Sequence, residues 1–192
     1  MPGTPESATQ SVGSRTVHAT EAHRLRRIFR SMPTDAARTR ILFVCLGNIC
    51  RSPAAEGIFI HRARERGVLD RFEVDSAGLG SWHAGDRPDP RTLAEAARRG
   101  IHLPSVARQV DAEDFDRHHL IVYMDEANRS GLRRRGAPDD KLRAMAAYQR
   151  GDGPDDVADP YEHGPEAFAA MFDHLERAVA GMLDELSGGV AG

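Results

Sequence analysis

The sequence predicts a doubly wound α/β domain with a four-stranded parallel sheet flanked by helices. Two observations predict this class. Short apolar runs typical of buried parallel strands alternate with stretches whose apolar residues recur at helical spacing. The first run, residues 41–45, leads into a short Gly-Asn loop that is followed at once by a helix start. Such strand-loop-helix units place a binding site at the carboxyl ends of the strands.

The helix after this first loop is predicted to begin near Ser52. Ser52 is suited to cap a helix, Pro53 to its first turn and Glu56 to the positive end of its dipole. The later elements follow the same alternation. Strands are predicted at residues 72–75 and 120–124, and helices at 90–99, 126–135 and 166–186. The pattern thus locates three of the four expected strands.

Residues 1–38 are expected to form an extension of the domain, which spans 39–192. The first twenty residues are rich in Ser, Thr, Pro and Gly, a composition that favours disorder. Residues 21–32 carry apolar side chains at helical spacing among four arginines. Three interpretations of this basic segment stay open: a helix on the acidic body, a membrane-surface or targeting segment, and an extension without function.

The distribution of charge argues against a nucleic-acid partner. The formal net charge is -3, and residues 1–40 hold seven Arg against three acidic residues. The remainder holds 19 basic and 26 acidic residues. Nucleic-acid binding normally needs a net basic face, so an anion site in this acidic body must be local.

Cysteine content and hydropathy predict a cytoplasmic protein without a membrane span. The two cysteines, Cys45 and Cys50, do not form the disulfide framework of a small secreted domain. No stretch approaches the ~20 apolar residues that cross a bilayer. The N-terminus also lacks the apolar core of a secretory signal.

Residues 45–52, Cys-Leu-Gly-Asn-Ile-Cys-Arg-Ser, carry the clearest chemical pattern. A loop that turns from a strand into a helix points successive backbone N–H groups at one centre, where the helix N-terminus adds positive potential. The segment is therefore predicted to be a phosphate-binding loop after the first strand. Gly47 and Asn48 are residue types that tolerate the left-handed backbone angles of such a loop. Cys45 faces the same field, which stabilises a nucleophilic thiolate.

Arg51 and Ser52 complete this pattern. The planar fork of Arg51 matches two phosphoryl oxygens in both ground and transition states, and Ser52 is placed to donate its hydroxyl to the sulfur. Taken singly, a cysteine that ends a buried strand is usually a small apolar residue, and an arginine at a helix start is usually a solvated charge. Their joint spacing, between a strand and a helix, favours a catalytic site.

Residues 41–56 resemble the phosphate-binding loop of the low-molecular-weight protein-tyrosine phosphatases almost residue for residue. The resemblance covers residues 41 to about 186 and continues at 75–78, 81–82, 87–91, 107–109, 123–126 and 159–161. It implies a protein-tyrosine phosphatase that forms a phosphocysteine on Cys45 and acts on a phosphotyrosine-containing protein. No metal or other cofactor is expected, because a thiolate makes a metal-activated water unnecessary. We also expect a monomer.

The same resemblance assigns roles to further residues. Asp159 is implied as general acid and then general base, and Pro160 restricts its backbone. Trp82 and Tyr161 are expected to form aromatic walls that favour a flat phosphotyrosyl ring. Substrate contacts are also expected from the loop residues Leu46, Gly47, Asn48, Ile49, Cys50 and Ser52.

Three residues near the loop are given supporting roles. Asn48 and Ser76 are expected to hold the loop by hydrogen bonds, as in the family. Cys50 either fills space or, as in relatives, forms a reversible disulfide with Cys45 that protects it from over-oxidation. One position departs from the family, because Ser105 stands where many relatives have His.

Three alternative functions remain to be distinguished. A thiol-coupled arsenate reductase of this fold passes oxidation along additional cysteines, and this chain has only Cys50 beyond Cys45. A phosphoarginine phosphatase resembles this loop but carries Thr where this chain has Ile49. A non-catalytic phosphate-binding module does not need Cys45, Arg51 and Asp159 together.

Overall fold

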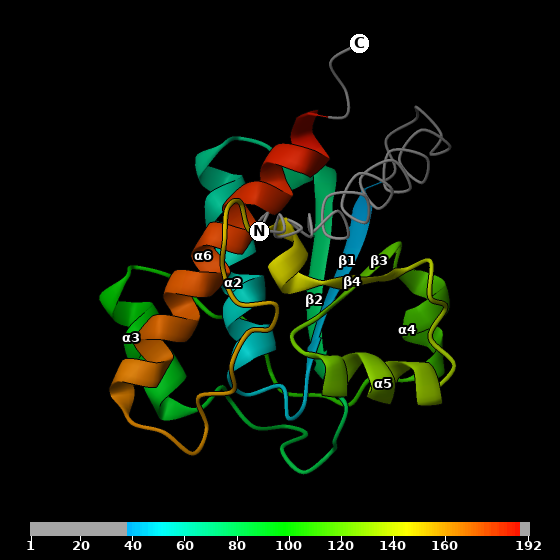
Figure 1. Cartoon of the computed structure of the whole chain (residues 1–192), viewed down its shortest axis with the longest axis horizontal. Coiled ribbons are helices and arrows are strands. Elements are labelled where there is room, and N and C mark those ends of the chain that lie inside the picture. The colour runs from blue at the N-terminus through cyan, green and yellow to red at the C-terminus, as the bar shows by residue number, and fades with distance from the viewer. Residues whose placement is uncertain (1–37, 189–192) are drawn as a thin grey trace, which may run out of the picture. The chain divides into compact units, whose positions relative to one another are not determined.

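The computed structural model describes residues 38–188, which form a parallel sheet with helices on both faces (Figure 1). The helix predicted at residues 21–32 lies outside the described residues. The sheet contains β1 (Thr39–Cys45), β2 (Phe72–Gly78), β3 (Leu120–Tyr123) and β4 (Leu142–Ala144). All pairs are parallel and the order is β2-β1-β3-β4. The predicted four-stranded parallel α/β fold is confirmed.

The helices lie in two groups. Figure 1 shows α2 (Arg51–Glu65), α3 (Pro90–Arg98) and α6 (Pro165–Gly188) on one side of the sheet. The other side carries α4 (Ala112–Arg117) and α5 (Glu126–Arg134). Short 3-10 turns occur at Leu69–Arg71 and Met145–Tyr148. The 24-residue α6 is the longest helix in the described part of the chain, as predicted.

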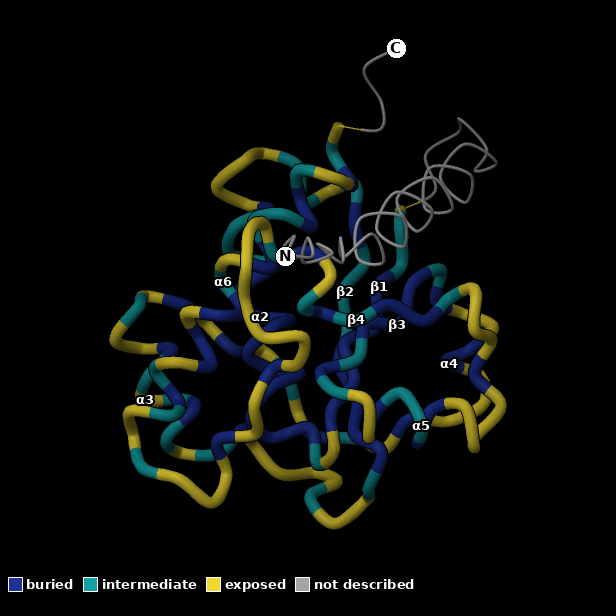
Figure 2. Tube along the Cα trace, in the orientation of Figure 1, coloured by how far each residue is buried: buried dark blue, intermediate teal, exposed yellow. Residues whose placement is uncertain are grey.

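Side chains that alternate between the two faces of β1 contribute to the core on both sides of the sheet. Leu42 and Val44 belong to an apolar cluster with Phe115 of α4 and Leu132 of α5. On the other face Phe43 packs on Phe59 of α2, with ring centroids 6.0 Å apart. Residues 41–45 are all buried, which confirms the buried strand predicted from this apolar run. Figure 2 shows the same distribution, with the strands dark blue and teal and many of the connecting loops yellow.

Strand order places the loop after β1 at a crevice. The chain runs from β1 through α2 to β2 on one side, and β3 then pairs with the opposite side of β1. In doubly wound sheets, ligands bind where the strand order reverses in this way, beyond the carboxyl ends of the strands. In residues 38–188 no helix is both long and apolar enough to cross a membrane.

Candidate active site

The loop from Cys45 to Arg51 has the backbone of an anion-binding turn. Asn48 takes a left-handed φ of 57°, and its backbone N–H donates to the Sγ of Cys45 at 3.3 Å. Gly47 does not lie in the left-handed region, which corrects the backbone role expected for it. Its missing side chain instead makes room for His83, whose Cδ2 lies 3.2 Å from the place a Cβ would take.

A buried hydrogen-bond network holds this loop from beneath. The Nδ2 of Asn48 donates to the Oγ atoms of Ser52 and Ser76, both at 2.9 Å. Its Oδ1 accepts from the backbone N–H of Arg108 at 3.0 Å. Asn48 is fully buried, so these three groups fix the left-handed residue from several directions. Neither Asn48, Ser52 nor Ser76 lines the slot above the loop.

The predicted helix cap at Ser52 is wrong. Helix α2 begins at Arg51, its N-cap is Cys50, and no side chain caps it. Ser52 lies inside the first turn, where its Oγ is 3.1 Å from the Sγ of Cys45. No capping side chain therefore satisfies the first backbone N–H groups of α2, and such groups are donors for an anion.

The predicted dipole role of Glu56 is also wrong, because this carboxyl group lies beyond the first turn of α2 and is buried. Glu56 is 5% exposed and accepts a 2.5 Å hydrogen bond from the Oγ of Ser105. Burial raises its pKa above the ordinary value, although the hydroxyls of Ser105 and Ser76 act in the opposite direction. Ser105 is thus a hydrogen-bond partner of Glu56.

Arg51 is a buried cation between two carboxylates. It is 2% exposed. One guanidinium nitrogen donates to Asp125 at 2.5 Å and to the carbonyl of Val157 at 3.3 Å, and the other donates to Asp159. Burial would lower its pKa, but the negative charges of Cys45, Asp159 and Asp125 outweigh burial and raise the pKa above its ordinary value. Arg51 therefore stays charged. Its buried Nε has no hydrogen-bond partner among the described residues.

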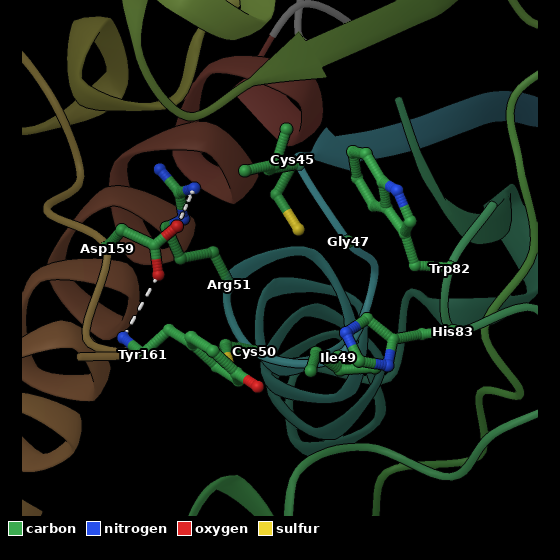
Figure 3. Close-up of a pocket in the computed structure, with 10 residues that line it drawn as sticks. Cys45, Gly47, Ile49, Cys50, Arg51, Trp82, His83, Asp159 and Tyr161 are labelled. Carbon is green, nitrogen blue, oxygen red and sulfur yellow. Dashed lines mark hydrogen bonds and ion pairs between the residues drawn. The ribbon is translucent and has the colours of Figure 1, made fainter. Parts of the chain in front are cut away.

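The side chains around the loop form a slot whose floor holds Cys45 (Figure 3). In this view Asp159 and Tyr161 lie on one side, and Trp82 and His83 lie on the other. Trp82 is 71% exposed and Tyr161 is 44% exposed, so both rings stand at the mouth. The lining comprises Cys45, Leu46, Gly47, Ile49, Cys50, Arg51, Trp82, His83, Asp159 and Tyr161.

The two cysteines near the floor are both free thiols. Burial raises the pKa of Cys50 to about 12, so Cys50 remains protonated near neutral pH. The Sγ of Cys45 accepts from the backbone N–H of Asn48 at 3.3 Å and lies 3.1 Å from the Oγ of Ser52. In residues 38–188 there is no group of three or more His, Cys, Asp or Glu arranged to hold a metal ion.

Sequence comparison identifies the family. A family model described as low molecular weight phosphotyrosine protein phosphatase matches residues 40–190. The chain belongs to the low molecular weight phosphotyrosine protein phosphatase family. A phosphatase of this family from Schizosaccharomyces pombe is 46% identical over 96 residues, which cover 50% of this chain and 62% of that relative. The matched part is thus less than two thirds of the length of that relative.

Solved structures of similar sequence share the fold. A protein tyrosine phosphatase from Entamoeba histolytica is 33% identical with a TM-score of 0.76, and the match covers 80% of this chain and 99% of that one. The Drosophila arginine phosphatase DARP is 30% identical with a TM-score of 0.70, over 76% of this chain and 96% of that one. The fold therefore accommodates phosphatases named for two different substrates.

Sequence reasoning missed two side chains that complete this family site. His83 lines the slot, and its Nδ1 lies 3.2 Å from a carboxylate oxygen of Asp86. Its position next to Trp82 was the available signal. Asp125 matched the family without a role, and the structure pairs it with Arg51. Asp125 also caps α5 by accepting from the backbone N–H of Asn128 at 2.7 Å, which fixes its carboxylate beside Arg51.

Proposed function

We propose that this protein hydrolyses phosphotyrosine in protein substrates through a phosphocysteine on Cys45, with Arg51 binding the phosphoryl group and Asp159 transferring protons. One observation carries the proposal. The thiol of Cys45, the guanidinium of Arg51 and the carboxyl of Asp159 come from the end of β1, the start of α2 and the segment before α6, and all three line one slot.

In the first step the Cys45 thiolate attacks phosphorus, and the bond from phosphorus to the phenolic oxygen breaks. The phosphoryl oxygens are bound by the loop N–H groups and by Arg51, whose Nε is an available donor and whose other nitrogen now faces Asp159. When a phosphoryl oxygen replaces Asp159 as the acceptor of the Arg51 hydrogen bond, the carboxyl group of Asp159 is free to reach the leaving oxygen. Asp159, in its protonated form, then gives that oxygen a proton.

In the second step water attacks the phosphocysteine, and the same carboxylate accepts the proton of that water. The bond between sulfur and phosphorus breaks, inorganic phosphate leaves, and Cys45 departs as a thiolate. The Asn48 N–H and the Ser52 hydroxyl, 3.3 and 3.1 Å from Sγ, stabilise the returning charge. The cycle needs neither a metal nor another cofactor, because the thiolate is the nucleophile.

The walls of the slot support an aryl phosphate as substrate. Trp82 and Tyr161 stand at the mouth above the sulfur, and Ile49 adds an apolar surface below them. A flat ring fits between aromatic walls, whereas the short side chain of phosphoserine does not extend from a protein surface to the floor of a slot. We therefore propose a phosphotyrosine-containing protein as the partner.

A phosphoarginine phosphatase is the second candidate, favoured by the structural likeness to the Drosophila arginine phosphatase. The side chain of Ile49 argues for the aryl ester, because the phosphoarginine branch carries the smaller, polar Thr at this place. A thiol-coupled arsenate reductase ranks lower, since Cys45 and Cys50 are the only cysteines of the chain.

Phosphate release from matched peptides tests the proposal. We expect the kcat/KM for a phosphotyrosine peptide to exceed those for phosphoserine and phosphoarginine peptides of the same sequence by at least tenfold. A preference for phosphoarginine would replace the proposed substrate. We further propose a monomer in a reducing, cytoplasmic compartment, which keeps both cysteines as thiols. Sedimentation and localisation of a tagged chain check these two statements.

A further inference from the structure

Arg91, in the first turn of α3, contacts the segment that carries Asp159. Its guanidinium donates to the backbone carbonyl of His163 at 3.1 Å. It also lies 5.5 Å from the centroid of the Tyr161 ring and 4.5 Å from that of Phe168. Arg91 therefore touches the turn that follows Asp159 and the first part of α6, where this turn ends.

A second set of contacts fixes Arg91 itself. Its Nε donates to one carboxylate oxygen of Asp89 at 3.0 Å and another nitrogen donates to the second oxygen at 2.9 Å. This two-point pairing sets the plane of the guanidinium. Asp89 also caps α3, because the same carboxylate accepts the backbone N–H of Arg91 at 2.8 Å. The pairing with Asp89 thus orients the guanidinium of Arg91 independently of its contacts with the Tyr161 and Phe168 rings.

The same pair is joined to the phosphate loop. The backbone N–H of Asp89 donates to the carbonyl of Ile49, the residue above the loop floor, at 2.9 Å. Asp89 and Arg91 therefore connect the loop that holds Cys45 to the turn that holds Asp159. No residue of this pair lines the slot, so the connection lies outside the region that a substrate occupies.

We propose that Arg91 is a positioning residue for Asp159: it holds the turn 160–164 at a fixed height above the phosphate loop. The proposal rests on the proposed function, in which Asp159 protonates the leaving oxygen. The local contacts of Asp159 leave room for such a role, because its side chain is 39% exposed and its Oδ1 accepts from the Tyr161 N–H at 3.1 Å. Contacts that hold Tyr161 therefore help to place Asp159, beside the direct hydrogen bond that Asp159 accepts from Arg51.

A displaced acid has a recognisable kinetic signature. Misplacement of a reacting group by about 1 Å costs up to roughly 100-fold in rate. The loss falls on esters whose leaving group needs a proton, such as phenyl phosphate, and much less on p-nitrophenyl phosphate, whose leaving phenolate is stable without one. A general loss of folding or substrate binding lowers kcat/KM for both esters equally.

The test measures kcat/KM for these two esters in Arg91→Ala, Arg91→Lys and the matched control Arg98→Ala. Arg98 lies on the same helix, is exposed and pairs with Glu95. We expect Arg91→Ala to lower kcat/KM for phenyl phosphate at least tenfold and for p-nitrophenyl phosphate less than threefold, with no change in Arg98→Ala. Arg91→Lys keeps the charge but loses the two-point pairing, so it should show the same selectivity for phenyl phosphate. Equal losses on both esters, or none, overturn the proposal.

Asp159→Asn separates this inference from the proposed function. When Asp159→Asn slows phenyl phosphate cleavage and Arg91→Ala then adds less than twofold, the two residues act through one group and the proposal holds. If Arg91→Ala lowers kcat/KM for phenyl phosphate as much in the Asp159→Asn background as in the unaltered protein, the positioning role is overturned but Asp159 remains the acid. An unchanged rate in Asp159→Asn itself overturns the proposed mechanism. Should Arg91→Ala fail to fold, Arg91→Lys supplies the same comparison.

Discussion

The Oγ of Ser52 lies 3.1 Å from the Sγ of Cys45, in the first turn of α2. A hydroxyl at this place donates to the thiolate that leaves in the second step. We predict that Ser52→Ala lowers kcat by about tenfold, as expected for one lost donor at a developing charge. Rapid-quench measurements should find phosphocysteine accumulating. Ser130→Ala, on α5, serves as the control; an unchanged kcat in Ser52→Ala would remove this role.

Asp159→Asn should slow phenyl phosphate hydrolysis by about 10²- to 10⁴-fold, the usual contribution of general acid-base catalysis. Asparagine keeps the size of the side chain and a hydrogen bond toward Arg51 but transfers no proton. The matched control is Asp156→Asn, an exposed carboxylate earlier in the same segment. Steady-state rates on phenyl phosphate check the prediction, and similar losses in both variants contradict it.

Gly78→Ala should deform the phosphate loop. A Cβ on Gly78 would lie 3.0 Å from both the backbone N of Asn48 and the carbonyl carbon of Gly47. Backbone atoms cannot move aside as a side chain can, so we expect about 1 to 3 kcal/mol of lost stability and at least a tenfold loss of kcat/KM. Gly188→Ala, where a Cβ meets nothing within 4 Å, is the control. Thermal unfolding and kinetics of both variants check the prediction. Full activity in Gly78→Ala would refute the close approach of Gly78 to the loop backbone.

Glu56→Gln should change how stability depends on pH. Burial raises the pKa of Glu56 above its ordinary 4.5 in the folded state. Between the two pKa values the folded protein keeps a proton that the unfolded chain releases, so stability falls as pH rises through this window. Glutamine carries no titrating proton. We therefore expect the melting temperature of Glu56→Gln, relative to the unaltered protein, to rise as the pH increases above 4.5.

The control for this pH series is Glu162→Gln, an exposed carboxylate in the turn after Asp159. The rise for Glu56→Gln should exceed any change that this surface control shows over the same pH range. A constant difference for Glu56→Gln would show that the buried carboxyl group keeps an ordinary pKa.

The local pattern of apolar residues predicted much of the fold. The elements that it did not predict were missed for physical reasons. The run at residues 41–45 predicted β1 because a strand buried on both faces is apolar throughout. Strand β4 escaped notice because it has three residues, Leu-Arg-Ala, and its centre is Arg143. Arg143 is 3% exposed, a burial that no local pattern around a charged residue predicts. Helix α4 has only six residues, too few to show helical periodicity.

The site also has features that the sequence predicts and features that it does not. Cys45, Asn48 and Arg51 belong to one contiguous loop, so their meeting is predictable from the sequence around them. The role of Gly47, whose missing side chain makes room for His83, depends on a contact between segments that no spacing rule supplies. Ser52 was misplaced as a cap because capping statistics ignore the competing bond to sulfur. Contacts formed across the fold are what the sequence alone did not predict.

The most direct test of the proposed chemistry is to detect the covalent intermediate. The protein is mixed with a phosphotyrosine peptide, quenched in acid within milliseconds and digested, and the peptide that contains Cys45 is weighed by mass spectrometry. We expect one phosphate on Cys45, none on Cys50, and none in Cys45→Ser, which should also fail to turn over p-nitrophenyl phosphate. Turnover by Cys45→Ser at the normal rate would contradict the proposed chemistry.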